Sequence, residues 1–435
     1  MSKPLSFQCH LRNTIKDVFI SRGYTEIPYT EEEDEEDSLE WDFIWASRAW
    51  IHGKMLGTSP VVLRPSQRVN HFPNSFELTR KDLMAKNLMR LSRELRKTGQ
   101  EATVDFFPQT FVLPNDFLRF KDELKDKEQI WIAKPVGGSM GQGIVFLKGE
   151  SEAISWHSKN QNKFTTSETP EDRMRCTFVV QRYISNPFLI GGRKFDIRLY
   201  ALTLSFSPLI VYIFRGGFCR FSSQPFSMTN FERDIHLTNI AVQTHSESYN
   251  PRHGCKWDTH SLRTYFSHRY GHEPTNRLFT AIQGIILNSL LSVLSSVIPD
   301  KHSYELYGYD ILIDSDMRPW LIEINASPSL DANTEDDYDM KFSMLNEMLD
   351  LVQFQMAKDN NEEFPLHYGG FDLSWNSGPV TSKATSNITS YIGCQFGING
   401  SPHNPYRTKS QFTVKKIAAH IQQPNVKQEP KETPV

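Results

Sequence analysis

The chain has 435 residues, enough for two or three domains, and its 38% hydrophobic, 12% aromatic and 23% charged residues are typical of an ordinary globular protein. The five cysteines are scattered and never form a CxxC pair, which argues against a disulfide framework or a zinc site and for a reducing compartment. The N-terminal segment MSKPLSFQCHLR has no apolar signal region. The longest apolar run, residues 279–298, is broken by polar residues, so it predicts a buried helix and no membrane insertion.

The formal charge of −3 hides an uneven distribution. Residues 31–37 are seven consecutive acids, without which the charge would be +4, and this run predicts a disordered loop. Basic residues gather between Arg80 and Lys97, where only Asp82 and Glu94 oppose them. Such a helix face either attracts an acidic partner or is simply solvated, and charge alone does not decide between the two.

Hydrophobic periodicity predicts the elements in chain order. The aromatic segment 41–50 alternates like a buried strand that leads into a helix, and 78–98 has helical spacing that ends at Gly99, a cap candidate. The polar stretch 150–175 is expected to be a loop. We expect strands at 130–133, 144–147, 176–183, 194–206, 208–214, 309–313 and 320–324, an extended segment at 106–114, and helices at 277–298 and 340–354.

A glycine-rich segment joins two of these strands in WIAKPVGGSMGQGIVFL (residues 131–147). Glycines allow backbone amides to approach a phosphate closely, and Lys134 at the end of the first strand supplies a counter-charge. The segment is not a Walker loop, because GxxxxGK[ST] is absent and a strand follows instead of a helix. By itself, the pattern fits a plain glycine hairpin as well as a hairpin that covers phosphates.

The segment DILIDSDMRPWLIEINASPS (residues 310–329) carries the strongest pattern in the chain. Glu323 and Asn325 lie two apart on a strand and therefore share a face, and Asp310 lies on the preceding strand. A glutamate between Ile322 and Ile324 is costly to bury unless it is paired or bound to a metal. Carboxylate and amide oxygens on one sheet surface are the ligands that Mg²⁺ prefers, completed by phosphates and water.

A third group of charges lies in QRYISNPFLIGGRKFDIRLYAL (residues 181–202). Lys194, Asp196 and Arg198 alternate, so all three share one face of a strand while Phe195 and Ile197 face the core. This face could bind phosphate and carboxylate groups, or it could be an ion-pair ladder on a solvated surface. Further polar groups come from Arg220 and from HLTN, residues 236–239.

Together these segments resemble the tubulin–tyrosine ligase-like proteins, and most closely their polyglutamylase branch, associated with cilia and flagella. ELTRKDLMAKN, WIAKP, QRYISNPFLIGGRKFDIRLY, HLTN, GCKW, ELYGYDILID and LIEINASPS occur in the family's order. The resemblance implies an α/β (α+β) ATP-grasp fold, with a nucleotide held between a central and a C-terminal sub-domain. The implied sub-domains are 1–75 (a small N-terminal one with the acidic loop 31–37), 76–180 (central, with the glycine loop), 181–358 (C-terminal, with the Mg²⁺ site) and an extension over 359–435 that is largely disordered after about 381.

The resemblance also implies roles for individual residues, with ATP and Mg²⁺ as cofactors. Arg198 and Glu323 would be catalytic, and Asp310, Glu323 and Asn325 would bind the metal. The incoming amino acid would contact Arg220, Lys256 and Lys341. The ATP-binding residues would be Lys134, Met140, Gly141, Gln181, Arg182, Tyr183, Ile184, Lys194, Asp196, Thr238 and Asn239.

The sequence departs from the family pattern at two places. Met140 stands where relatives usually have Gln, which removes a polar contact over the phosphate loop. Ile240 and Ala241 follow HLTN where many relatives have Tyr-Ser. Neither departure removes a metal ligand or the phosphate lysine.

The implied activity is ATP-dependent addition of glutamate to the γ-carboxylate of glutamates in tubulin tails, through an acylphosphate. The implied partners are tubulin or microtubules and free L-glutamate, with no nucleic acid, in the cytoplasm and cytoskeleton at a cilium or flagellum axoneme or basal body. Three alternatives stay open: a tubulin glycylase, a ligase acting on another acidic protein, and a catalytically weak microtubule-binding scaffold. Glutamate is favoured as donor because three cations could face its two carboxylates, whereas glycine needs fewer and tyrosine an aromatic pocket.

Overall fold

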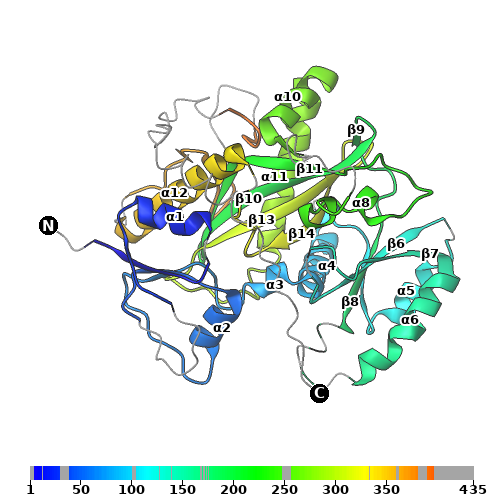
Figure 1. Cartoon of the computed structure of the whole chain (residues 1–435), viewed down its shortest axis with the longest axis horizontal. Coiled ribbons are helices and arrows are strands. Elements are labelled where there is room, and N and C mark those ends of the chain that lie inside the picture. Colours follow the sequence, from blue (N-terminus) through cyan, green and yellow to red (C-terminus); the bar gives the residue numbers. More distant parts are fainter. Residues whose placement is uncertain are drawn as a thin grey trace, which may run out of the picture.

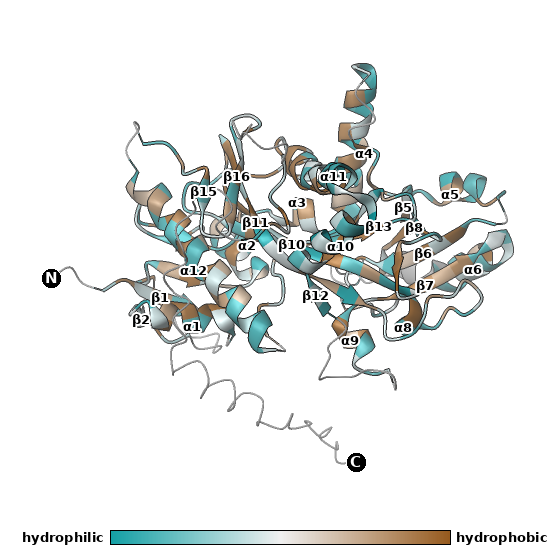
Figure 2. Cartoon of the chain, turned by 90° about the horizontal axis from the view of Figure 1, so that it is seen from above, coloured by the Kyte–Doolittle hydropathy of each residue, from teal (hydrophilic) through white to brown (hydrophobic). Residues whose placement is uncertain are grey.

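The computed structural model describes residues 4–395 except 12, 30–38, 100–103, 127, 139, 167, 168, 170, 171, 173, 175, 247–255, 333, 359–361 and 381–388. The acidic run 31–37 therefore lies outside the described residues. The elements form three sheets with helices packed against them, a mixed α/β architecture (Figure 1). The sheet of β1–β4 and the sheet of β5–β8 lie at opposite ends of the molecule, with the large sheet between them (Figures 1 and 2).

The N-terminal sheet is parallel and has the strand order β2-β1-β3-β4. The aromatic segment 41–50 forms a buried strand followed by a helix, which confirms the prediction. Trp41 and Ile44 are fully buried in a small core beneath this sheet. The elements are β1 (Ser6–Cys9), α1 (Thr14–Ser21), β2 (Thr25–Glu26), β3 (Phe43–Trp45), α2 (Arg48–Leu56) and β4 (Arg68–Val69).

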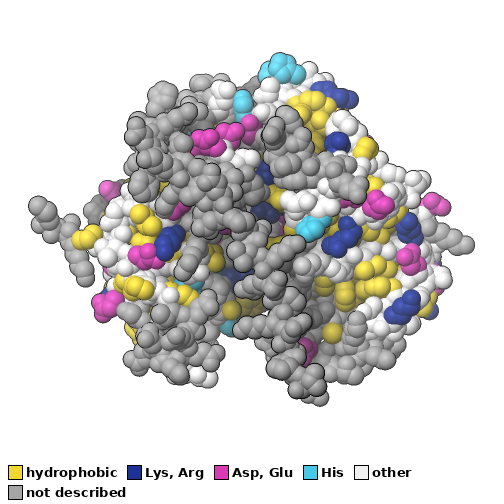
Figure 3. All heavy atoms as spheres, viewed as in Figure 1, with side chains coloured by type: hydrophobic (Ala, Val, Ile, Leu, Met, Phe, Trp, Pro, Cys, Tyr) yellow, Lys and Arg dark blue, Asp and Glu magenta, His cyan; other side chains and the backbone are white. Residues whose placement is uncertain are grey.

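The helix expected over 78–98 is two helices, α3 (Phe76–Thr79) and α4 (Lys81–Lys97), because Arg80 between them has an extended backbone. Gly99 follows α4 with φ of +73°, as expected of a residue that ends a helix. The basic residues of α4 are partly engaged inside the protein, since Arg90 donates to the Ser292 carbonyl at 2.8 Å. On the face shown in Figure 3, Lys and Arg side chains are interspersed with Asp and Glu.

The second sheet is antiparallel, with the order β5-β8-β6-β7. The prediction of a loop over 150–175 was wrong, because α6 covers Gly149–Thr166. Its sequence, GESEAISWHSKNQNKFTT, has few apolar residues, and those that anchor it, Ala153 and Trp156, meet a core that only the tertiary fold supplies. The other elements are β5 (Thr110–Leu113), α5 (Phe117–Glu123), β6 (Ile130–Pro135), β7 (Val145–Lys148) and β8 (Phe178–Arg182).

The large sheet has the order β14-β13-β10-β11-β16-β15, with β9 paired to β10 and β12 paired to β11. All these pairs are antiparallel, and the hairpin expected from residues 194–214 is β10 and β11. The strands are β9 (Leu189–Ile190), β10 (Arg193–Phe206), β11 (Leu209–Phe221), β12 (Lys256–Asp258), β13 (Glu305–Ile313), β14 (Pro319–Asn325), β15 (His367–Tyr368) and β16 (Phe371–Asn376).

Alternation along β10 divides its side chains between two cores. Phe195, Ile197 and Leu199 are buried with α10 (Thr259–Tyr270) and α11 (His272–Leu291) on one face, as predicted. Further along the strand, Tyr200 and Leu202 face the opposite side and pack with α12 (Glu335–Ala357) and α1. The short helices α8 (Arg233–His236) and α9 (Ile240–Gln243) follow β11. Among the described helices, α11 included, none combines the length and apolarity needed to cross a membrane.

The expected sub-domain limits fall close to, but not at, the limits of the sheets. Strand β8 runs across the expected boundary between residues 180 and 181, and completes the sheet of β5–β7. Strands β15 and β16, within the expected extension, extend the large sheet beside β11. We therefore propose that the folded unit of the C-terminal part continues past residue 358.

Residues 389–395 pack onto the large sheet although they follow residue 381, after which disorder was expected. Arg263 of α10 donates to the Ile392 carbonyl at 2.7 Å, and the amide of Gly393 donates to the Arg215 carbonyl at 2.8 Å. The ring of Tyr391 stacks against the Arg215 guanidinium, which itself holds Asp372 of β16 in a two-point ion pair. Ile392 is only 2% exposed. Residues 381–388 and 396–435 lie outside the described residues.

Truncation tests the contribution of this segment. A chain that ends at Val380 is expected to lose about 3 kcal/mol of unfolding free energy, since it loses the buried Ile392 side chain and leaves Arg263 without its carbonyl acceptors. A chain that ends at Gln395 is the matched control and should retain its stability. Urea unfolding measures both, and equal midpoints for the two truncations would contradict the prediction.

Candidate active site

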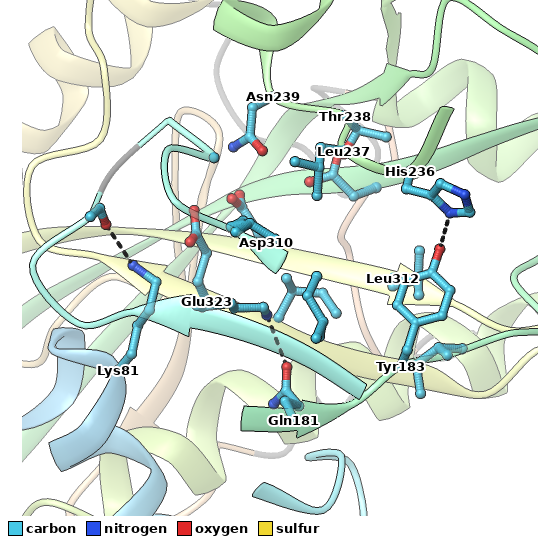
Figure 4. Close-up of a pocket in the computed structure, with 18 of the residues that line it drawn as sticks. Lys81, Gln181, Tyr183, His236, Leu237, Thr238, Asn239, Asp310, Leu312 and Glu323 are labelled. Carbon is cyan, nitrogen blue, oxygen red and sulfur yellow. Dashed lines mark hydrogen bonds between the residues drawn. The ribbon is translucent and has the colours of Figure 1, made fainter. Parts of the chain in front are cut away.

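A cleft lies between the small antiparallel sheet and the large sheet (Figure 4). It is lined by β6, the glycine loop and the end of β8 on one side, and by β10, β11, β13, β14 and the segment 236–239 on the other. Segments far apart in the sequence thus meet here. The predicted site residues that line it are Lys134, Met140, Gly141, Gln181, Arg182, Tyr183, Ile184, Lys194, Asp196, Arg220, Thr238, Asn239, Asp310 and Glu323.

Two carboxylates meet on the floor of the cleft. Asp310 of β13 and Glu323 of β14 are direct cross-strand partners, and in Figure 4 both side chains project from the sheet into the cleft. An irregularity in the pairing follows this pair, so that Ile322 as well as Glu323 lines the cleft. Asn325, which does not line it, donates to Glu323 at 3.3 Å.

The donor set fits a divalent cation. The carboxyl groups of Asp310 and Glu323 interact directly, and neighbouring like charges are unfavourable unless a cation or a proton lies between them. Two carboxylates and the amide oxygen of Asn325 are hard oxygen donors, too few to enclose an ion by themselves but sufficient for Mg²⁺ that also takes phosphate oxygens and water. Across the described residues, no group of three or more His, Cys, Asp and Glu side chains is arranged to hold a metal ion, and this site offers two carboxylates and an amide.

Two arginines form ion pairs with Asp310. Arg198 donates to both of its oxygens, at 2.5 and 3.1 Å, and Arg220 lies 2.7 Å from Oδ2. Burial alone would raise the pKa of Asp310, but the two guanidinium groups outweigh it and hold this pKa well below its usual range. Arg220 also forms a two-point pair with Asp196, its cross-strand neighbour. The carboxylate of Asp310 is therefore charged and fixed in orientation at neutral pH.

Two buried lysines face the cleft from opposite sheets. Lys134 of β6 donates to the side-chain oxygen of Gln181 at 2.9 Å, and Lys194 of β10 donates to the Tyr183 hydroxyl at 3.0 Å and to the His236 carbonyl at 2.9 Å. Burial lowers the pKa of Lys134 to about 8 and that of Lys194 to about 7, because desolvation disfavours the ammonium form. Neither lysine has a carboxylate in ion-pair contact within the described residues. An anion bound in the cleft would favour the charged, ammonium form of both lysines.

His236 is the last residue in a series of hydrogen bonds that runs from Lys194 through Tyr183. Its Nε2 lies 2.7 Å from the Asn230 carbonyl, which only accepts, so Nε2 carries the proton and Nδ1 accepts from the Tyr183 hydroxyl at 2.7 Å (Figure 4). Burial, and then the charge of Lys194, lower the pKa of His236 and favour this neutral form. Tyr183 thus accepts from the lysine and donates to the histidine.

The glycine loop is held over the cleft by cations from both sides. Lys81 of α4 donates to the Gly138 carbonyl at 3.1 Å, and Arg233 of α8 donates to the Gly141 carbonyl. Met140 has a positive φ of 55° and is 65% exposed, so its side chain contributes surface to the cleft without a polar contact. A side chain at Gly141 would approach Val242 and Leu237 at 3.2 and 3.3 Å, which accounts for glycine where the loop meets the 236–242 segment.

The three residues expected to hold the incoming amino acid lie beside the carboxylate pair. Lys256 is the cross-strand partner of Arg220, and Lys256 and Lys341 both contact Oδ2 of Asp337 at 3.1 Å. Lys341 also donates to the Asp331 carbonyl at 2.6 Å. Together with Arg198, these cations form ion pairs with the carboxylates of Asp196, Asp310 and Asp337. Arg198, Lys256, Lys341 and Asn325 do not line the cleft itself.

Several lining residues had no assigned role at the sequence level. Lys81 was noted only as part of a basic helix, although it follows the helix break at Arg80 and turns toward the glycine loop. His236 and Leu237 belong to the HLTN segment, in which only the last two residues were assigned. Apolar residues form the end of the cleft beside Tyr183 and could be recognised only from the fold: Ile132, Ile144, Leu237, Leu312 and Ile322.

Comparison with known proteins now decides the family. A family model described as the tubulin-tyrosine ligase family matches residues 61–362, well over half of the chain. The chain belongs to this family. The matched residues 61–362 include every residue that lines the cleft.

Relatives match this family member over most of its length. It is 39% identical to the probable tubulin polyglutamylase TTLL9 of Rattus norvegicus, over 87% of this chain and 85% of that protein. It is 39% identical to the probable alpha-tubulin polyglutamylase Ttll1 of Tetrahymena thermophila, over 81% and 86%. With the probable tubulin polyglutamylase ttll-9 of Caenorhabditis elegans it shares 35% identity over 91% of both chains.

The lowered pKa of Lys194 gives a pH dependence that can be measured. Above about pH 7 the free protein holds this lysine largely neutral, whereas a bound triphosphate would favour the ammonium form, so we expect nucleotide binding to take up a proton at pH 8. We expect ATP affinity to weaken as pH rises from 7 to 9, in steps of up to about tenfold per unit and per lysine. Calorimetry at pH 8 in two buffers of different ionisation heat measures the uptake, and Lys194→Met should reduce it. A pH-independent affinity without proton uptake would contradict the prediction.

Proposed function

We propose that this chain is an ATP-dependent ligase that adds glutamate to the γ-carboxylate of glutamates in tubulin C-terminal tails. The observation that carries the proposal is the direct pairing of Asp310 with Glu323 on the floor of a cleft that buried lysines face from both sheets. The polyglutamylase names of relatives at 35–39% identity supply the substrate.

We further propose that the fold is an ATP-grasp, with the nucleotide between the sheet of β5–β8 and the large sheet. The cleft is lined from both sheets and from the segment 181–184 that connects them, which supports a hinge at Gln181, Arg182, Tyr183 and Ile184 beside the adenine. Its apolar end at Ile132 and Leu312 suits a planar base, and its lysines suit the phosphates. The assignment supports a small sub-domain over 1–75, a central one over 76–180 that continues through the end of β8, and a C-terminal one over 181–358 that continues through β16.

Different residues of the cleft would then contact different parts of the nucleotide. Lys134 and Lys194 would bind phosphates as ammonium ions, and the backbone around Met140 and Gly141 would cover them. Asp196, Thr238 and Asn239 line the same space and would contact the nucleotide from the large sheet. The exposed Met140 leaves these contacts in place, which favours an active enzyme over a scaffold.

Asp310, Glu323 and Asn325 would hold Mg²⁺, which neutralises phosphate charge while ATP activates the acceptor carboxylate as an acylphosphate. Arg198 would act beside them. Its guanidinium does not line the cleft and is fixed by Asp310, so it would stabilise negative charge on the reacting groups at longer range, without reorganising. Fixing charges in advance in this way is the main contribution a protein makes to phosphoryl transfer.

Lys256, Lys341 and Arg220 would bind the carboxylates of the incoming amino acid. Three cations that could face two carboxylates favour glutamate over glycine or tyrosine. A tubulin-modifying enzyme of this kind would act in the cytoplasm on the cytoskeleton, at a cilium or flagellum axoneme or basal body. The proposal calls for no nucleic acid.

Incubation of tubulin with ATP, Mg²⁺ and labelled glutamate, glycine or tyrosine tests the proposal, with mass spectrometry of the tubulin tails as readout. We expect glutamate to add to the side chain of a tail glutamate. Preferential glycine incorporation would assign a glycylase instead. If another acidic protein is modified and tubulin is not, that protein is the substrate in place of tubulin. If the chain binds no ATP, it is a microtubule-binding scaffold and not a ligase.

A further inference from the structure

A shallow groove lies along the exposed face of α10 and shares no lining residue with the nucleotide cleft. Its α10 residues recur every four positions, at 260, 264 and 268 and at 261, 265 and 269, so they share one face of the helix. Figure 3 shows histidine, hydrophobic and basic side chains together over α10, at the top of the view. The lining includes no carboxylate, and its aromatic and basic members are Trp257 of β12 and His260, Tyr265, His268 and Arg269 of α10.

Trp257 presents its indole ring to solvent beside the N-terminal end of α10. The residue is 39% exposed, and its ring meets those of Tyr265 and Phe221 edge-on, with centroids 6.0 and 5.4 Å away. Within the described part of the chain, the indole N–H has no hydrogen-bond acceptor. An exposed tryptophan of this kind is typical of a binding surface, because the ring supplies apolar area and the N–H a donor.

Arg269 supplies a fixed positive charge at the C-terminal end of α10. Its guanidinium donates to the hydroxyls of Tyr265 and Tyr270, at 2.9 and 3.0 Å, and lies 5.9 and 5.5 Å from the centres of their rings. No acidic side chain among the described residues forms an ion pair with it. The acid nearest to the groove in sequence, Asp258, is the N-cap of α10. The groove therefore offers an oriented cation and free hydrogen-bond donors beside aromatic rings.

Strand β12 connects the groove to the residues proposed to bind the incoming amino acid. Lys256 and Trp257 are consecutive in this strand, so their side chains point to opposite faces: Lys256 toward Asp337, and Trp257 toward α10. Among the described strands, β12 pairs only with β11, which leaves it at an edge of the sheet. A sheet is about 10 Å thick with its side chains, so roughly three to five residues of extended peptide pass around this edge.

The charge of the groove decides between its possible occupants. The chain's own residues 396–435 follow Gln395, whose side chain contacts His260 at 3.2 Å, but they carry six Lys and Arg against two Glu, the same sign as the groove. An acidic peptide has the opposite sign, with carboxylates for Arg269 and for the indole N–H and methylene groups that pack on the rings. We propose that the groove binds the acidic tail of the acceptor tubulin beyond the glutamate that is modified, an inference that rests on the proposed ligase activity.

Acceptor peptides of two lengths separate the groove from the cleft. A second contact acts by raising the local concentration of the acceptor, so we expect Trp257→Ala and Arg269→Gln each to raise KM for a tail peptide of about 20 residues by about tenfold, with kcat within about twofold of the wild type. KM for a peptide of about five residues, too short to pass around β12, should stay unchanged. Arg277→Gln, which removes an exposed arginine of α11 outside the groove, is the matched control and should leave both KM values unchanged.

Three results would overturn the assignment of the groove. In variants with a normal thermal unfolding temperature, one is an unchanged KM for the long peptide, and another is an equal rise for both peptides, because the substitutions would then act on the cleft. The third is a chain ending at Gln395 that binds the long peptide about tenfold more tightly than the full chain, because residues 396–435 would then occupy the groove.

Failure of the ligase itself is a separate outcome. A wild-type protein that joins glutamate to neither peptide overturns the proposed function, and the groove is then judged from the fluorescence anisotropy of the labelled long peptide. Binding that both variants weaken about tenfold would support the groove as a site for acidic peptides. Displacement of this peptide by an equal concentration of a single-stranded oligonucleotide would overturn it in favour of a nucleic-acid site.

Discussion

Glu323→Gln is expected to reduce ligation by at least about 100-fold while the protein remains folded. The substitution keeps the size of the side chain but removes one of the two charges that face each other across β13 and β14. A metal ion that stabilises a phosphoryl transition state contributes several kcal/mol, and about 1.4 kcal/mol corresponds to a tenfold change in rate. Incorporation of labelled glutamate measures the loss.

The control for this variant is Glu335→Gln, which removes an exposed acid from the first turn of α12. It should ligate at the wild-type rate. Thermal unfolding shows whether each variant is intact, and without Mg²⁺ Glu323→Gln should be about as stable as the wild type, because the amide has nearly the same size and can still donate a hydrogen bond to Asp310. Wild-type activity in Glu323→Gln would remove the basis of the metal assignment.

Gly308→Ala is expected to damage the site and the stability together. The glycine pairs with Asn325, and an added Cβ would lie 2.8 Å from Cβ of Pro328 and 3.4 Å from Cδ of Arg198. Such overpacking costs about 1–3 kcal/mol in unfolding free energy, and relief by movement of Pro328 would displace the segment between Asn325 and α12. We expect ligation to fall by about tenfold or more, because a displacement of one ångström near a reacting centre has effects of this size.

Gly284→Ala is the matched control for that substitution. Gly284 lies in α11 with nothing within 4 Å of an added Cβ, so alanine should stabilise the helix by about 0.5–1 kcal/mol and leave ligation unchanged. The two glycine variants should therefore shift the urea midpoint in opposite directions. Equal stabilities and equal activities of the two would show that β13 and the Pro328 segment are not tightly packed at this point.

The strands that position the site could be predicted from the sequence because their pattern has a period of two. Alternation placed Lys194, Asp196 and Arg198 on one face of β10, and the structure confirms it. The same reasoning placed Glu323 and Asn325 together, and they are in hydrogen-bond contact. The pairing of Asp310 with Glu323 followed because a short turn joins their strands.

What the sequence could not show depends on contacts between distant segments. Helix α6 was missed because its polar sequence carries little helical periodicity, and its few apolar residues meet a core built from other strands. The ion pairs of Arg220 with Asp196 and of Lys341 with Asp337 were not foreseen, so cations that looked free are already partly balanced.

The most direct measurement is a structure of the protein with Mg²⁺ and a non-hydrolysable ATP analogue. The account predicts one metal ion about 2.0–2.1 Å from oxygens of both Asp310 and Glu323, with the phosphates toward Lys134 and Lys194 and the base beside Tyr183. A nucleotide bound outside the cleft, or a metal ion that does not touch this pair of carboxylates, would contradict it.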